Sequence, residues 1–306
     1  MQPLRGILLK VMSVCMFIAM SSLIKAASDD VPPGEAVFFR SFFALPIIFG
    51  WLAIRGELRN GWKTINPMGH FWRGLVGTAA MGLGFTGLGL LPLPEVTAIG
   101  YAAPLLVVIF AAMFLNEQVG VFRLSAVALG MIGVLIVLSP RLSIGATLGT
   151  AETLGAVVVL MGAVMAALAQ VFVRKLVSTE GTAAIVFWFT ITSSFMALLT
   201  IPWGWVIPAP SVAAMLICSG LFGGMGQIFL TSSYRFADAS LVAPFDYSSM
   251  LLALGIGYFV FDEVPTATML LGAAVVIAAG VLIIWRERQL GLKRAQQRKA
   301  TGNLGS

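Results

Sequence analysis

Apolar runs of about twenty residues follow one another along almost the whole chain, and no other feature of the sequence constrains the fold as strongly. A run of this length is long enough to cross the hydrocarbon core of a bilayer as a helix. Among the 306 residues 59% are hydrophobic and 10% are charged, which is more apolar surface than a soluble domain can bury. The sequence therefore predicts an all-α membrane protein.

The runs predict ten transmembrane helices, joined by short connections that contain the prolines and glycines typical of turns. The predicted spans are residues 6–27, 35–54, 71–91, 96–115, 121–138, 154–176, 182–201, 211–233, 240–261 and 267–285. No small-residue cleavage site follows the first run, so we interpret this run as the first helix and not as a signal peptide.

The positions of Lys and Arg predict how the chain is oriented in the membrane. These residues gather in alternate connections and in the basic tail of residues 286–306, a bias that is typical of cytoplasmic segments. We therefore predict that both termini are cytoplasmic and that the tail contacts anionic lipid. The net charge of +6 could also suggest nucleic acid, but cations in short loops and a tail do not form a binding face, and we predict no nucleic-acid partner.

Two stretches of the sequence repeat one pattern, an apolar span, a short polar break and a second apolar span. The first stretch is Val96 to Leu138 and the second is Ser240 to Trp285. The five-residue segments near the ends of the two stretches are nearly identical, Gly133 to Val137 and Gly280 to Ile284. The similarity indicates that one membrane unit has been duplicated.

The opening helices repeat as well, because Lys25 falls on Arg174 when the first half is aligned with the second. Each half then holds five spans, and an odd number makes the second half enter the membrane in the opposite sense. Inverted repeats of this kind are typical of secondary transporters. The predicted domains are a first five-helix repeat at 1–142, a second at 150–285 and the basic tail at 286–306.

The doubled order of these features resembles the drug/metabolite transporter superfamily of the EamA type. The helix ends at Leu115–Glu117 and Phe261–Glu263 share this likeness, and Glu35–Arg40 and Ala243–Tyr247 are similar to a subgroup that includes transporters for riboflavin and for S-adenosylmethionine. The resemblance implies alternating-access transport of a small organic metabolite across a bacterial inner membrane, specifically riboflavin or a similar cofactor-like solute. The alternative is an amino-acid or drug exporter of the same superfamily.

Several kinds of chemistry lack a signature in the sequence. No P-loop for nucleotide hydrolysis and no H-E-x-x-H metal motif occurs, and His70 is the single histidine. We therefore predict neither a metal, a cofactor nor an enzymatic activity, although a membrane-embedded lipid-modifying enzyme stays as the second alternative. The direction of transport, coupling to a proton and the oligomeric state remain open.

Asp246 is the first candidate for a residue that binds the solute. It lies six positions into the ninth predicted span, ~9 Å along a helix, and a charge at that depth usually faces the bundle interior. Pro244 frees a backbone carbonyl one turn earlier, and Tyr247 adds a hydroxyl group. Asp246 therefore either binds substrate or a proton, or it caps a broken helix and pairs with a cation.

Uncharged side chains within other spans are further candidates. Tyr101, near the helix-breaking Pro104, either stacks on a ring of the solute or is a core residue. Gln170 and Gln227 either bond a neighbouring helix or line a cavity, and Trp188 is either a structural residue or lines the same cavity.

Basic side chains near the ends of spans have two readings. Arg40 is expected near the outer surface, where it snorkels to water or clamps an anion or carboxylate. We expect Lys10 to be an anchor at the inner surface and His70 to be solvated beside Arg73 at the cytoplasmic entrance of the third span.

The repeat also predicts two gates. Lys25 and Glu263 end helices at the outer surface, and Arg174 and Glu117 end the corresponding helices at the inner surface. If the repeat is inverted, each pair forms when its own side of the transporter closes. In the alternative reading the four residues are interface anchors that never meet.

Overall fold

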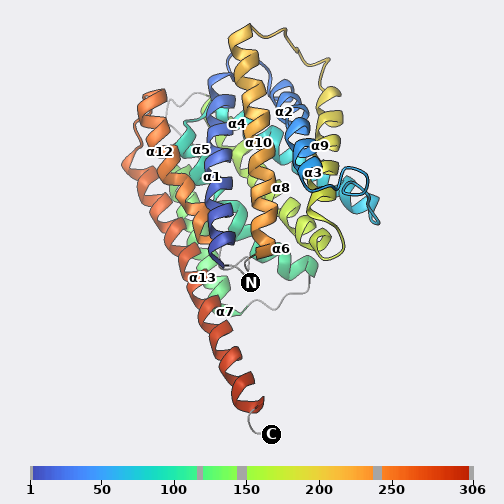
Figure 1. The fold of residues 1–306 in the computed structure, drawn as a ribbon. Coiled ribbons are helices and arrows are strands. Elements are labelled where there is room, and N and C mark those ends of the chain that lie inside the picture. Colours follow the sequence, from blue (N-terminus) through green and yellow to red (C-terminus); the bar gives the residue numbers. More distant parts are fainter. Residues whose placement is uncertain (1–2, 116–119, 143–149, 237–242, 303–306) are drawn as a thin grey trace.

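The computed structural model is a bundle of helices and describes residues 3–115, 120–142, 150–236 and 243–302 (Figure 1). Each predicted span coincides with one helix or with two helices in line, and these residue ranges contain no strand. The predicted all-α membrane fold is confirmed. The predicted border between the halves, around residues 143–149, lies outside the described residues.

Seven spans are uninterrupted and three are broken. The uninterrupted helices are α1 (Pro3–Ala26), α4 (Pro67–Leu90), α7 (Val121–Leu142), α8 (Thr150–Val177), α9 (Thr182–Leu198), α10 (Pro210–Phe236) and α13 (Ala267–Gly302). The interrupted spans are α2 (Pro33–Phe42) with α3 (Leu45–Ile54), α5 (Leu93–Gly100) with α6 (Ala102–Leu115), and the 3-10 helix η1 (Ala243–Tyr247) with α12 (Ser248–Phe261).

The surface of the bundle is apolar, as a lipid-facing surface must be. Five of the described helical segments are long and apolar enough to cross a membrane, and four shorter ones are also apolar. Large hydrophobic side chains point outward on many helices, among them Leu8, Phe114, Leu135 and Phe259. The predicted tail begins as a continuation of α13, which extends beyond the other helices at the bottom of Figure 1.

The helix pairings follow a pattern that relates the two halves. α1 packs on α10, and α4 packs on α8. In the predicted repeat α1 corresponds to α8 and α4 to α10, so these two contacts are equivalent. α7 packs on α13, and α2 packs on α9. In each of these pairs the two helices correspond to each other in the predicted repeat. The inverted repeat stays a prediction, and these pairings support it.

Glycine allows a close helix crossing between α7 and α13. A Cβ atom added to Gly133 would lie 2.9 Å from the carbonyl oxygen of Gly272, and one added to Gly272 would lie 2.7 Å from the carbonyl oxygen of Gly133. The two backbones are therefore in direct contact, which only small residues allow in a membrane bundle.

Two of the helix interruptions are placed at corresponding positions of the halves. Pro104 has no N–H to donate to the carbonyl group one turn back, and the helix bends at Tyr101, between α5 and α6. In the second half Ser248 and Ser249 donate hydrogen bonds of 2.6 Å to the carbonyl oxygens of Phe245 and Asp246, at the junction of η1 and α12. These side chains satisfy carbonyl groups that an uninterrupted helix would bond through its backbone.

Candidate functional site

An ion pair inside the bundle joins the first helix to the broken span of the second half. Lys10 Nζ lies 2.7 Å from Asp246 Oδ1. Lys10 on α1 is 2% exposed, whereas the side chain of Asp246 in η1 is 41% exposed. A lysine this deeply buried needs a counter-charge, because an isolated buried ammonium group is very costly. The pair therefore has one shielded member and one that solvent or a solute can reach.

The two interrupted spans meet beside this pair. The ring of Tyr101 packs edge-on against that of Tyr247, with centroids 5.1 Å apart. The Tyr101 hydroxyl group lies 2.7 Å from Ser249 Oγ and donates a 3.3 Å hydrogen bond to the carbonyl oxygen of Tyr247. Because both tyrosines stand at helix junctions, the breaks of the two halves are tied to each other by side chains.

The end of the bundle where α1 finishes is held closed by a second ion pair. Lys25 Nζ lies 2.9 Å from Glu263 Oε1, and both side chains are mostly buried. The sequence analysis predicted that these two residues would meet, and the structure brings them together. Their role as a gate stays a prediction.

Backbone groups complete this closed end. Lys25 Nζ also donates hydrogen bonds to the carbonyl oxygens of Leu88, at 3.2 Å, and Leu91, at 2.9 Å. The second oxygen of Glu263 accepts a 2.9 Å hydrogen bond from the backbone N–H of Leu93. Asp262 ends α12 in the left-handed region, with φ of 54°, and so turns the chain to place Glu263 over the α4–α5 turn.

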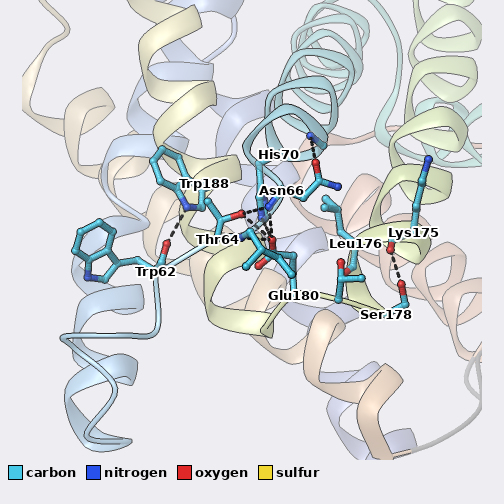
Figure 2. A network of polar contacts seen from close by, with 12 residues as sticks. Trp62, Thr64, Asn66, His70, Lys175, Leu176, Ser178, Glu180 and Trp188 are labelled. Carbon is cyan, nitrogen blue, oxygen red and sulfur yellow. Dashed lines mark hydrogen bonds and ion pairs between the residues drawn. The ribbon is translucent and has the colours of Figure 1, made fainter.

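A polar cluster joins the connections that enter α4 and leave α8 (Figure 2). Glu180 Oε1 accepts hydrogen bonds from Thr64 Oγ1 at 2.7 Å and from the backbone N–H groups of Ile65 and Asn66 at 2.9 Å. His70 Nε2 lies 3.6 Å from the same oxygen. One carboxylate therefore fastens the connection before α4 to the one after α8.

Hydrogen bonding sets the charge state of Glu180. Burial raises the pKa of Glu180, but the hydrogen bonds from Thr64, Ile65 and Asn66 lower it further than burial raises it, so the pKa lies below 4.5. The carboxylate stays ionised at neutral pH.

Trp188 belongs to this cluster and not to the centre of the bundle. Its Nε1 donates a 2.8 Å hydrogen bond to the carbonyl oxygen of Trp62, as Figure 2 shows. The two tryptophans line a recess of about 470 Å³ together with Lys63, Thr64 and Ile65.

Three expectations about basic residues are wrong. Arg40 is 3% exposed, so the expectation that it snorkels to the surface is wrong because neighbouring helices cover it, while its alternative role as an anion clamp stays a prediction. Lys10 is not a surface anchor but the partner of Asp246. His70 is 2% exposed and not solvated, since it packs against Glu180 and the ring of Trp188.

The other predicted residues are placed as follows. Gln170 is exposed on α8, Gln227 is buried on α10, and Pro104 and Pro244 lie near the starts of α6 and η1. Arg174 is in the last turn of α8, but Glu117 lies outside the described residues, so the second predicted gate pair is untested.

Sequence reasoning missed Arg73, Glu180 and the partner of Asp246. Lys10 carried a usable signal, because it lies well inside an apolar run and such charges usually face the interior. Arg73 was counted among the loop cations, although it stands six residues beyond the start of α4. Glu180 lies in a connection and carried no signal.

Comparison with known proteins gives the family context of this arrangement. The model of the EamA-like transporter family matches residues 4–139 and again residues 153–285. A crystal structure of a protein with 18% identity superposes with a TM-score of 0.67 over 93% of this chain and 98% of that chain, a likeness of fold alone.

Similar relatives carry the names of transporters. The S-adenosylmethionine uptake transporter of Rickettsia conorii is 27% identical over 87% of this chain and 85% of its own length. The pseudopaline exporter of Pseudomonas aeruginosa is 28% identical over 91% of this chain and 95% of its own length. The riboflavin transporter of Rhizobium johnstonii is 27% identical over 86% of this chain and 85% of its own length. The resemblance seen in the sequence is confirmed, and the chain belongs to the EamA-like transporter family, within the drug/metabolite transporter superfamily.

Proposed function

We propose that the protein is a secondary transporter that moves a small organic metabolite across the bacterial inner membrane by alternating access. The observation that carries the proposal is the meeting of the two interrupted spans, at Tyr101 and Tyr247, beside the ion pair of Lys10 and Asp246. Broken helices at corresponding positions of two repeats, with a charge between them, are where secondary transporters bind their solutes. Asp246 is the partly exposed charge in this arrangement and the residue that reaches the solute.

The solute is a polar molecule of the size of a cofactor. Riboflavin and S-adenosylmethionine are the first two candidates, because relatives of similar identity are named as their transporters. The relatives of similar identity include the S-adenosylmethionine uptake transporter and the pseudopaline exporter, so their names favour neither direction.

The gates follow from the closed end. With Lys25 and Glu263 in contact, the pathway is shut where α1 ends, and solute reaches the central pair from the side where α1 begins. Opening in the other direction breaks this pair while the opposite end closes.

Transport into proteoliposomes tests the proposal. The purified protein is reconstituted and assayed for counterflow of riboflavin, S-adenosylmethionine and aromatic amino acids, with and without a proton gradient. We expect exchange of at least one of these solutes, and a dependence on the gradient if a proton is coupled. Reconstituted, folded protein that exchanges none of the panel would contradict the proposed solute class.

A further inference from the structure

Two buried arginines share one aromatic ring in the middle of the bundle. Arg40 Cζ on α2 lies 5.5 Å from the centre of the Phe189 ring, and Arg73 Cζ on α4 lies 3.9 Å from it. The two residues are only 3% and 6% exposed. They stand ~10 Å from the starts of their helices, which enter the bundle from opposite ends, so both guanidinium groups approach its middle.

Neither guanidinium group has an acidic partner within the described part of the chain. Three of the nitrogens, Arg40 Nε, Arg73 Nε and Arg73 Nη1, are closed off from solvent and donate no hydrogen bond. The acid on α2, Glu35, is engaged elsewhere, because it accepts a 3.0 Å hydrogen bond from the backbone N–H of Val206. Two like charges buried without an anion are costly, which indicates that a negative group is missing from the site.

Glycine residues hold the guanidinium groups in place. A Cβ atom at Gly77 would collide with Nη1 of Arg73, and one at Gly223 would lie 2.9 Å from Nε of Arg40. The guanidinium groups of Arg73 and Arg40 therefore lie directly against the backbones of α4 and α10, respectively. The three buried nitrogens have no hydrogen-bond acceptor among the described residues and are the donors that a ligand would meet.

A recess leads toward the pair from one end of the bundle. It has a volume of about 200 Å³ and is lined by residues of α1, α2 and α4, including Ala36 and Phe85. Ala36 stands one helical turn before Arg40, so the two side chains share a face of α2. The recess lies at the end of the bundle where α1 finishes, on the side of the Lys25–Glu263 pair, and comes within one turn of α2 of Arg40.

We propose that Arg40 and Arg73 bind an oxyanion of the transported solute, a carboxylate or a phosphate group. The planar fork of a guanidinium group matches both oxyanions in geometry and charge. The Phe189 ring lies within cation–π distance of both guanidinium groups and so provides a neutral, favourable contact that does not use their N–H donors. The inference rests on the proposed transport function and adds the chemical class of the solute.

Thermal unfolding of the purified protein tests binding without transport. Potassium citrate, succinate and phosphate are each compared with potassium chloride at equal ionic strength. We expect an oxyanion to raise the unfolding midpoint of the wild type by roughly 5 °C at a hundredfold excess over Kd. The larger shift, with succinate or with phosphate, identifies the preferred group.

Substitutions connect the shift to the two arginines. Arg40→Gln and Arg73→Gln should each abolish it, whereas the matched control Arg59→Gln, at an exposed position before α4, should keep it. Arg40→Lys and Arg73→Lys retain the charge but lose the fork, and should weaken anion binding at least tenfold in a folded protein. If no oxyanion shifts the midpoint, or if the shift survives in the Lys and Gln variants alike, the proposal is overturned.

A transport assay separates this inference from the proposed function. Uptake of S-adenosylmethionine is compared with uptake of its decarboxylated form, which lacks the carboxylate. We expect a KM at least tenfold lower for the carboxylated solute and loss of this preference in Arg73→Lys. Transport with equal KM values for both solutes overturns the proposed oxyanion site but still supports the proposed transport function. If neither solute moves, the transport proposal fails for this solute, and the thermal shift still decides the site.

Discussion

Single charged residues inside the bundle differ in how their charge is balanced, and the difference predicts what each substitution does. Asp246 is half exposed and neutralises a lysine that is almost fully buried. Arg40 and Arg73 have no such partner among the described residues. Neutralisation of Asp246 therefore takes a counter-charge away from a buried cation, whereas substitution of either arginine by a neutral residue removes a buried cation.

Asp246→Asn keeps the shape of the side chain and removes its charge. We expect transport to fall at least tenfold, because the carboxylate that faces the solute is lost, and stability to fall because the buried Lys10 loses the counter-charge of Asp246. Counterflow in proteoliposomes measures the first effect and thermal unfolding the second. Asp262→Asn is the matched control, since Asp262 is exposed and asparagine tolerates its left-handed backbone. Unchanged exchange in Asp246→Asn would leave Asp246 with a structural role only.

Glu180→Gln should expose the pH dependence of the polar cluster before α4. The pKa of Glu180 is lowered in the folded protein, so its ionised form contributes stability that is complete above pH 4.5 and disappears as the pH falls through the folded value. We expect the wild type to unfold at a higher temperature than Glu180→Gln at neutral pH, and the difference to shrink below pH 4.5. Glu57→Gln, which removes an exposed carboxylate, is the control. A difference that is the same at pH 7 and below pH 4 would contradict this account.

At the scale of helices, the contact of Gly133 with Gly272 makes α7 and α13 intolerant of any added atom. Gly272→Ala places a methyl group against a carbonyl oxygen and should lower the stability by ~1–3 kcal/mol, as overpacking does. Gly50→Ala on α3 meets no atom within 4 Å and should leave the unfolding midpoint unchanged or raise it slightly, since alanine favours a helix over glycine. Equal midpoints for the two variants would show that the helices can separate without cost.

The sequence predicted helix ends better than helix faces. Lys25 and Glu263 were paired correctly because both stand at helix ends, where the repeat fixes their level in the membrane. The buried sides of Lys10, Arg40 and His70 were not predicted, because a long side chain at moderate depth can turn to lipid, to water or inward. Only the neighbouring helices decide between these directions, and the sequence alone does not place them.

The order of the spans was predictable for a different reason. Hydrophobic length predicts a span whatever surrounds it, and the break at Tyr101 followed from Pro104, which removes a backbone donor. The Glu180 cluster could not be predicted, because it depends on backbone N–H groups of a connection more than a hundred residues away. Such groups are present at every residue and leave no mark on the sequence.

For the molecule as a whole, the closed end predicts coupling between two residues that are far apart in the sequence. In Lys25→Glu and in Glu263→Lys, like charges face each other, and transport should fall in both. The exchange of both charges should restore part of it, with a coupling energy of ~1 kcal/mol in a double-mutant cycle. Recovery stays partial because a glutamate at position 25 cannot bind the carbonyl groups of Leu88 and Leu91. Additive losses would mean that the contact has no part in transport.

Orientation is the second prediction for the whole molecule. Cys15 and Cys218 are the cysteines of the chain, and their replacement by alanine gives a background for single-cysteine labelling. A cysteine at exposed position 29 should react with an impermeant reagent on intact cells, and a cysteine at position 59 only after permeabilisation. The opposite result would reverse the predicted orientation.

The way Lys25 and Glu263 are held also has a consequence for speed. Each has a backbone partner in the α4–α5 turn that does not depend on the other, Leu91 for the lysine and Leu93 for the glutamate. When the two side chains separate, each keeps a hydrogen bond to the backbone, so neither charge is left without a partner before water enters. If this contact opens as the predicted gate, we expect a small activation energy for the step, and a dwell time of the closed state that is set by rearrangements elsewhere in the bundle.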